Sequence, residues 1–278
     1  IQDMNRDGLP DLVVMGAQSY ESIMLFINKG DGNFDDKIVL QFPPVYGLSH
    51  FELADFNKDG YWDILMTNGD NWDLSAIRKS YHGVRIFLND RKNNFKEAFF
   101  NTVFGASKAM AHDFDGDGDL DLVVSNINAP AFLYRNNTDK NTKSNYLRLE
   151  LKDPQHKSVM GTRVTIYSNG KSQMSEATNA RGIYSTSESQ LHFGLGANTV
   201  DSLVVVWPNS RRHILKNVAV NKTLSLSPEN AKDLVEITNV PRPIFEEVSI
   251  NSLQITHREN NFDDYEKQVL LPHKMSQF

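Results

Sequence analysis

Short apolar runs bounded by turn residues recur along this chain. Three of them, at residues 12–15, 64–66 and 120–124, directly follow a loop rich in aspartate. Turn residues such as Gly16 and Asn126 come next, and a second apolar run then follows at residues 23–28, 84–89 and 131–136. Runs of this length and composition predict buried strands. The first half of the chain is therefore expected to repeat one unit, an acidic loop followed by strands.

The spacing of the loops gives the size of this unit. Asp3 and Asp55 are 52 residues apart, and Asp55 and Asp113 are 58 residues apart. The apolar stretches before the second and third loops, at residues 50–54 and 109–112, bring each unit to about four short strands. This period is typical of a propeller blade, whose sheet needs neighbours to bury its faces. Three loops make too few blades to close a ring, so we expect a piece of a longer protein.

The acidic loops are candidate metal sites. Residues 113–121 read Asp-Phe-Asp-Gly-Asp-Gly-Asp-Leu-Asp, and residues 3–11 and 55–63 are copies with fewer acids. Like charges so close together repel, and Ca²⁺ removes the repulsion by taking roughly 6–8 oxygen ligands. We expect about three Ca²⁺ sites, with side-chain ligands at loop positions one, three, five and nine and the backbone carbonyl at position seven. The predicted ligands are Asp3, Asn5, Asp7, Leu9 and Asp11 in the first loop, Asp55, Asn57, Asp59, Tyr61 and Asp63 in the second, and Asp113, Asp115, Asp117, Asp119 and Asp121 in the third.

Three alternatives bear on the same loops. An EF-hand needs a glutamate at position twelve and flanking helices, whereas position twelve here is Val14, Met66 or Val124 inside an apolar run. Magnesium is less suited, because it prefers a few carboxylates and several waters. The loops would also be explained as Asx-turns that bind no metal.

The second half of the chain lacks acidic loops but keeps strand patterns. Residues 136–144 are polar and predict a linker. Beyond it, residues 146–151 and 162–167 alternate, residues 202–207 form a continuous apolar run, and Asn169-Gly170 is a hairpin signal. One short helix is expected at residues 228–235. We predict an all-β fold, with propeller blades at residues 1–140, a β-sandwich at residues 141–230 and a terminal segment at residues 231–278.

Composition and charge narrow the possible functions. The chain has 278 residues, 40% of them hydrophobic and 23% charged, and no cysteine. No apolar run is long enough to predict a transmembrane helix. The net charge is −6, yet the loops hold 11 of the 35 acidic residues, so the remainder carries about +5 and three divalent cations would neutralise the total. No basic block or aromatic-basic pattern indicates binding to nucleic acid.

No motif of an enzyme is present. The chain has no zinc-protease helix, nucleophile elbow, dinucleotide fingerprint or P-loop, and we predict no enzymatic activity. His192 is interpreted as a structural histidine on a strand. A polar group near the C-terminus is interpreted as a solvated connection, because its spacing matches no metal template. That group comprises His257, Glu259, Asp263, Asp264 and His273. The aromatics Tyr20, Trp62, Trp72 and Tyr81 fall in or near loops, where they would contact sugars or a protein, and core packing is the alternative for Trp62, which lies inside the second loop.

The loops, each running into an apolar strand, resemble the FG-GAP/VCBS repeats of integrin-type β-propellers. The resemblance covers residues 1 to about 140. It implies that calcium in the loops has a structural role, with Asp113, Asp115, Asp117 and Asp121 matching the family pattern position by position.

The second half is similar to the ASPIC/UnbV domain, which follows FG-GAP repeats in cartilage acidic protein-like proteins and bacterial surface proteins. Four motifs carry this resemblance, at residues 145–147, 161–164, 191–196 and 201–208. Asn209-Ser210 departs from the Asp-Gly that more often follows the Trp-Pro of the last motif. Residues 245–274 resemble the lead-in to a further propeller.

Together these features predict a calcium-stabilised extracellular binding or scaffold protein that mediates protein-protein adhesion or assembly at the cell surface. The resemblance implies a bacterial cell-surface or outer-membrane-associated setting, with any membrane attachment made through other parts or a complex. The alternatives are a carbohydrate-binding surface protein of a glycan-uptake system and a polysaccharide-degrading enzyme on a calcium propeller. The expected partner is a protein or a surface glycan.

Overall fold

The computed structural model describes residues 1–17, 20–69, 81–127, 129–138, 143–155, 159–179, 190–231 and 233–234. All of them belong to one compact unit, residues 1–235. The fold is nearly all β, as predicted, and its several small sheets do not close into a ring. None of the described helices is long and apolar enough to cross a membrane. Trp72 and all of the predicted terminal segment 231–278 except residues 231 and 233–234 lie outside the described residues, as does the polar group of that segment.

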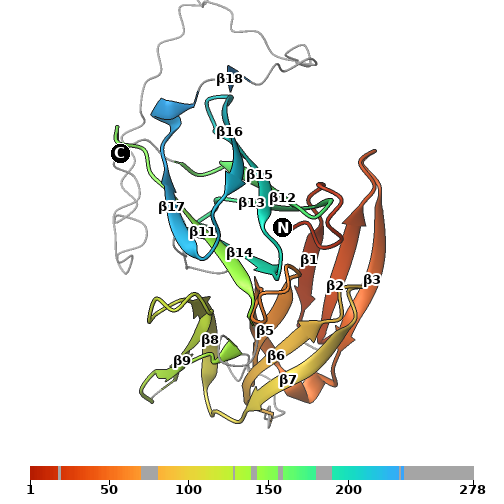
Figure 1. Ribbon diagram of the computed structural model, residues 1–278. Coiled ribbons are helices and arrows are strands. Elements are labelled where there is room, and N and C mark those ends of the chain that lie inside the picture. The colour runs from red at the N-terminus through yellow and green to blue at the C-terminus, as the bar shows by residue number, and fades with distance from the viewer. Residues whose placement is uncertain are drawn as a thin grey trace, which may run out of the picture. The chain divides into compact units, whose positions relative to one another are not determined.

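The first half of the chain forms three antiparallel sheets (Figure 1). The middle sheet has four strands, as predicted, and each flanking sheet has three among the described residues. The second acidic loop joins β4 to β5, the third joins β8 to β9, and the first leads into β1. The strands are β1 (Leu12–Gly16), β2 (Ser22–Asn28) and β3 (Phe34–Gln41); β4 (Leu48–Ala54), β5 (Asp63–Asn68), β6 (Gly83–Asn89) and β7 (Phe95–Asn101); β8 (Ala106–His112), β9 (Asp121–Asn126) and β10 (Phe132–Tyr134).

Strand β5 shows why these sheets need one another. All six of its residues are buried, and its side chains alternate between two hydrophobic clusters. Ile64 and Met66 pack with Ile23 of β2, while Leu65 packs with Ala109 of β8. Because both faces of the strand are covered, its sequence is a continuous apolar run. Burial between neighbouring sheets is the packing expected of propeller blades.

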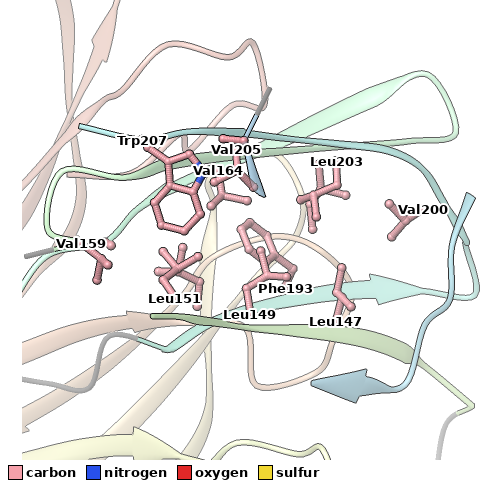
Figure 2. Packing of buried hydrophobic residues seen from close by; sticks show 14 of the residues in the cluster. Leu147, Leu149, Leu151, Val159, Val164, Phe193, Val200, Leu203, Val205 and Trp207 are labelled. Carbon is pink, nitrogen blue, oxygen red and sulfur yellow. The ribbon is translucent and has the colours of Figure 1, made fainter. Parts of the chain in front are cut away.

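The second half forms two sheets packed face to face, as a sandwich predicts. In the smaller sheet β11 pairs antiparallel with β14 and parallel with β17. Figure 2 shows the core between the sheets, where Leu149 and Phe193 meet Leu203 and Trp207. The sheets are β14 (Gln190–Gly196), β11 (Asn145–Leu151) and β17 (Lys222–Leu226); and β13 (Lys171–Glu176), β12 (Arg163–Ser168), β15 (Val200–Val206), β16 (Arg211–Val218) and β18 (Asp233–Leu234).

Two local predictions for this half have different outcomes. Asn169 and Gly170 join β12 to β13 with φ of 49° and 71°, which confirms the hairpin. The helix predicted at residues 228–235 is wrong. Only the 3₁₀ turn η2 (Pro228–Asn230) forms, and β18 follows it. Pairing of β18 with Arg211 and Arg212 at the edge of the sheet extends the chain where the local sequence favours a helix. The other 3₁₀ turn, η1 (Pro44–Tyr46), precedes β4.

Candidate metal centre

The three acidic loops adopt one backbone conformation. Positions four and six have positive φ in every copy. Position six is always glycine, with φ of 88° in the first loop, 87° in the second and 91° in the third. Position four is Arg6, Lys58 or Gly116, with φ of 65°, 55° and 81°. Two left-handed residues two positions apart turn the chain tightly, so that polar atoms of the loop point inward.

The aspartate at position one organises each turn. Its carboxylate accepts the N–H of the position-six glycine, at 2.9 Å in the first loop, 2.8 Å in the second and 2.9 Å in the third. The other oxygen accepts a second backbone N–H at 2.7 to 3.1 Å. The acceptors Asp3, Asp55 and Asp113 are all buried. A carboxylate held by two N–H groups is fixed in place before any ion binds.

Positions three and five differ between the loops. In the third loop Asp113, Asp115 and Asp117 each place a carboxylate oxygen within 4.8 Å of the others. In the first loop position three is Asn5, whose amide donates to Asp7 at 2.7 Å. Asx-turns occur in all three loops, since the position-five carboxylate accepts the N–H of position seven. The turns predicted by the metal-free alternative are therefore present, and they hold the same oxygens close together.

The aspartate at position nine occupies a different environment. Asp11, Asp63 and Asp121 are at most 2% exposed. One oxygen accepts the N–H of loop position two at 2.7 to 3.1 Å, and the other accepts a backbone N–H at 2.8 Å from the next strand or the residues after it. Asp121 is outside the close group formed by Asp113, Asp115 and Asp117. This residue ties the loop to the neighbouring hairpin strand, and its role as a ligand remains a prediction.

The partners of these aspartates are asparagines that sequence reasoning missed. Asn28, Asn89 and Asn136 each donate their backbone N–H to position nine. Each side-chain amide also donates at 3.1 Å to the carbonyl of loop position eight. A signal was visible, because the second apolar run of every repeat ends in asparagine.

Burial raises the pKa values of several carboxylates in the first two loops. Burial raises the pKa of Asp55 well above its ordinary value, and the nearby charges of Asp63 and Asp59 raise it further. Burial also raises the pKa of Asp63 to about 7. The pKa values of Asp3 and Asp11 are raised by burial as well. Crowded carboxylates with raised pKa values favour a bound cation, which compensates charges that water does not reach.

Basic residues already meet the acids of the third loop. Arg135 pairs with Asp115 at 2.9 Å and with Asp117 at 2.8 Å. Arg148 of β11 pairs with Asp113, and Lys58 of the second loop pairs with Asp119. None of these pairs was predicted from the sequence. The donor set of all three loops, consisting of carboxylates, amide oxygens and the predicted carbonyls of Leu9, Tyr61 and Asp119, fits a hard divalent cation.

The other candidate residues occupy varied positions. His192 faces the carbonyl of Gly118 at 3.3 Å, and burial lowers its pKa to about 4, so it is a neutral histidine within a packed junction. Trp62 packs against the cluster formed by the first two sheets, as the core-packing interpretation predicts. Tyr20 and Tyr81 are exposed, and Tyr81 stacks on Tyr46.

Comparisons with known proteins agree with this description. Residues 3–66 match the family described as FG-GAP-like repeat, and residues 152–233 match the family described as ASPIC and UnbV. Cartilage acidic protein 1 of Homo sapiens is 25% identical over 256 residues, which cover 70% of this chain and 38% of the relative. The Xenopus tropicalis protein of the same name is 25% identical over 244 residues, covering 84% of this chain and 37% of the relative.

Integrin alpha-7 of Homo sapiens is 28% identical over 148 residues, covering 49% of this chain and 12% of the relative. The chain thus spans less than two fifths of the length of each of these relatives. The matched family regions fall on the blades and on the sandwich described above. The chain joins FG-GAP-like repeats to an ASPIC/UnbV domain, as its sequence motifs predict.

Proposed function

We propose that this chain is a calcium-stabilised, non-enzymatic scaffold that mediates protein-protein adhesion or assembly outside the cell. The observation that carries the calcium assignment is the cluster of Asp113, Asp115 and Asp117 in a loop conformation that recurs twice more. The relatives, a cartilage acidic protein and an integrin alpha chain, support an extracellular setting and a protein partner. Cell-surface attachment is part of the same proposal.

The loops suit calcium at extracellular concentration. Loops that bind with a dissociation constant of about 10⁻⁴ M are saturated there, whereas the cytosol would leave them largely empty. A ligand that binds only the folded state stabilises it, so 5 mM calcium would add about 2 kcal/mol for each such site. For a unit of this size that corresponds to a rise in melting temperature of roughly 4–8 °C per site.

Thermal unfolding in calcium, magnesium and chelator tests the assignment. We expect calcium to raise the melting temperature well above that in EGTA, and magnesium to have a smaller effect. Asp115→Asn should remove much of the calcium-dependent rise, because it replaces a ligand that carries full charge. Asp36→Asn is the matched control, since Asp36 is an exposed acid on β3 away from the loops. Equal melting temperatures in calcium and EGTA would refute the calcium assignment.

The class of partner needs a separate assay. A glycan array tests the carbohydrate-binding alternative, for which the exposed Tyr20 and Tyr81 would supply stacking surfaces. Release of products from a panel of polysaccharides tests the enzymatic alternative. Specific glycan binding would replace the protein-partner proposal, and product release would replace the non-enzymatic one.

A further inference from the structure

We propose that the three acidic loops form the surface on which the chain's own sandwich domain docks, and that ion binding and docking reinforce each other. The docking face of the sandwich consists of β11, β13 and β14. The docking half of this proposal stands on the contacts below, and the coupling half rests on the proposed binding of calcium.

The first loop contacts β13 through Arg6. The Arg6 side chain donates from Nε to the carbonyl of Ser172 at 2.8 Å, and the Ser172 hydroxyl donates to the Arg6 carbonyl at 3.4 Å. The guanidinium also lies over the ring of Tyr61, 5.0 Å from its centre. Lys171 of β13 reaches the Tyr61 hydroxyl at 2.9 Å. One strand of the sandwich thus bridges the first and second loops.

The second loop contacts β14 by close backbone approach. The N–H of Gly196 donates to the carbonyl of Lys58 at 2.6 Å. A Cβ atom at Gly194 would overlap a carboxylate oxygen of Asp55, the position-one aspartate. Gly194 does not have a positive φ, so the closeness of the loop, and not the backbone conformation, demands glycine there. This gives a physical reason for the glycine in the Leu-His-Phe-Gly-Leu-Gly motif.

The third loop contacts both β11 and β14. His192 of β14 lies 3.3 Å from the carbonyl of Gly118, and Tyr146 of β11 occupies the space that a Cβ at Gly118 would need. The rings of Tyr146 and His192 stack with centres 5.8 Å apart. Arg148 of β11 pairs with Asp113. The sandwich therefore reaches the position-one aspartate of the third loop as well as that of the second.

Burial of charge distinguishes this junction from a chance contact. Lys58 is 2% exposed, although it lies on a turn that would otherwise face solvent. Its ammonium group pairs with the buried Asp119 and lies 5.4 Å from the ring centre of Tyr146. Lysine and aspartate are rarely buried unless they are paired, and the sandwich, through the ring of Tyr146, helps to cover this pair of two loops.

The sign of the coupling follows from the shared conformation. Docking uses the Lys58 and Gly118 carbonyls and the Asp55 and Asp113 carboxylates, and these are positioned only when the loops hold their left-handed turns. An ion that draws the loop oxygens together selects the same turns. Two ligands that select one conformation favour each other, and the effect is reciprocal. The loops are then covered by the sandwich, so an external protein partner would bind another surface.

Distance measurements on the whole chain test docking. The chain has no cysteine, so spin labels at Asp36→Cys on β3 and Lys216→Cys on β16, both exposed, report one distance. We expect a single narrow distribution, and Gly194→Ala should broaden it and shift it to longer distances. Gly161→Ala is the control, because Gly161 has a φ of 82° but open space around it, so alanine strains the sandwich without touching a loop. If Gly194→Ala leaves the distribution narrow and unchanged, docking by the loops is refuted.

A second pair of variants tests docking even if Gly194→Ala does not fold. Arg148→Gln removes the pair with Asp113, whereas Arg163→Gln removes an exposed pair with Glu176. Only Arg148→Gln should broaden the distribution. Equal distributions for the two variants would overturn the role of Arg148 in docking.

Calcium titration tests the coupling. EGTA should broaden the wild-type distribution, and Tyr146→Ala should weaken calcium binding at least threefold in isothermal titration, because it removes a docking side chain that contacts Gly118 and His192 but no predicted ligand. Calcium that binds equally to both proteins, or that lengthens the distance, would overturn the coupling but not the proposed function. Absence of calcium binding to the wild-type chain would overturn the proposed function and the coupling together, while the distances still decide docking.

Discussion

Replacing Asn89 with alanine should destabilise the second blade by about 2–3 kcal/mol. Asn89 is 5% exposed, and its side chain joins a loop to a turn. Its amide donates to the carbonyl of Trp62 at 3.1 Å, and its oxygen accepts the backbone N–H groups of Arg91 and Asn93 at 3.0 Å each. The backbone N–H of Asn89 still donates to Asp63 after the substitution, so the variant isolates the contribution of the side chain.

The magnitude follows from the groups left without partners. A typical hydrogen bond contributes about 1 kcal/mol net, and a buried group that loses its partner costs about 1–3 kcal/mol. All three of these bonds are part-buried, so the carbonyl of Trp62 and the N–H groups of Arg91 and Asn93 should each contribute to the loss. Asn28→Ala should cost less, since Asn28 makes the same bond to Pro10 from a half-buried position.

Urea unfolding followed by tryptophan fluorescence measures this loss. At a slope of about 2–3 kcal/mol per molar urea, the midpoint should fall by roughly 1 M. Asn209→Ala is the control, because its oxygen accepts a single N–H, that of Arg211, in an exposed turn. If Asn89→Ala and Asn209→Ala shift the midpoint equally, the asparagine does not stabilise the loop and the reasoning fails.

Two further predictions concern a buried histidine and a strained turn. Burial, together with the charge of Lys108, lowers the pKa of His50 from 6.5 to about 4, so the folded state binds fewer protons there than the unfolded state. The contribution of the neutral His50 to the free energy of unfolding is complete above pH 6.5 and is lost toward pH 4. Between pH 7.5 and 5 the wild type should lose up to about 2 kcal/mol of stability relative to His50→Gln. Parallel pH profiles of the two proteins in urea unfolding would refute this prediction. Ser210 has a φ of 62° in the turn after Trp207, so Ser210→Gly should stabilise the sandwich by about 0.5–1 kcal/mol, and a lower unfolding midpoint would contradict it.

The repeat was predictable because its signals are local. Alternating acids, the glycine at position six and the apolar run that follows lie within one short segment, and the structure gives that segment the same conformation three times. The helix prediction at residues 228–235 failed for the opposite reason. Proline and glutamate favour a helix locally, but pairing of β18 with β16, across the sheet, extends the chain after one turn. Tertiary pairing outweighed local preference there.

The junction between loops and sandwich was not predictable, because its partners are far apart in sequence. His192 was expected to be structural, and its partner Gly118 lies 74 residues away. Arg148 is one basic residue on an alternating strand, and nothing near it indicates a pair with Asp113 35 residues earlier. The asparagines that close each loop were visible in the sequence, yet their hydrogen bonds to the loop could be known only from the register of the next strand.

The basic residues at loop position four show how neighbouring repeats depend on one another. Arg6 of the first loop lies over Tyr61, which is position seven of the second loop. Lys58, at the same position of the second loop, pairs with Asp119, which is position seven of the third. The first and second loops therefore each supply a cation to the next loop, and the most acidic loop receives the only lysine of this set. Position four of the third loop is Gly116, which has no side chain that could pair with another loop. Repeats that contact only their neighbours gain stability from each interface, so loss of Lys58 should weaken the third loop as much as its own.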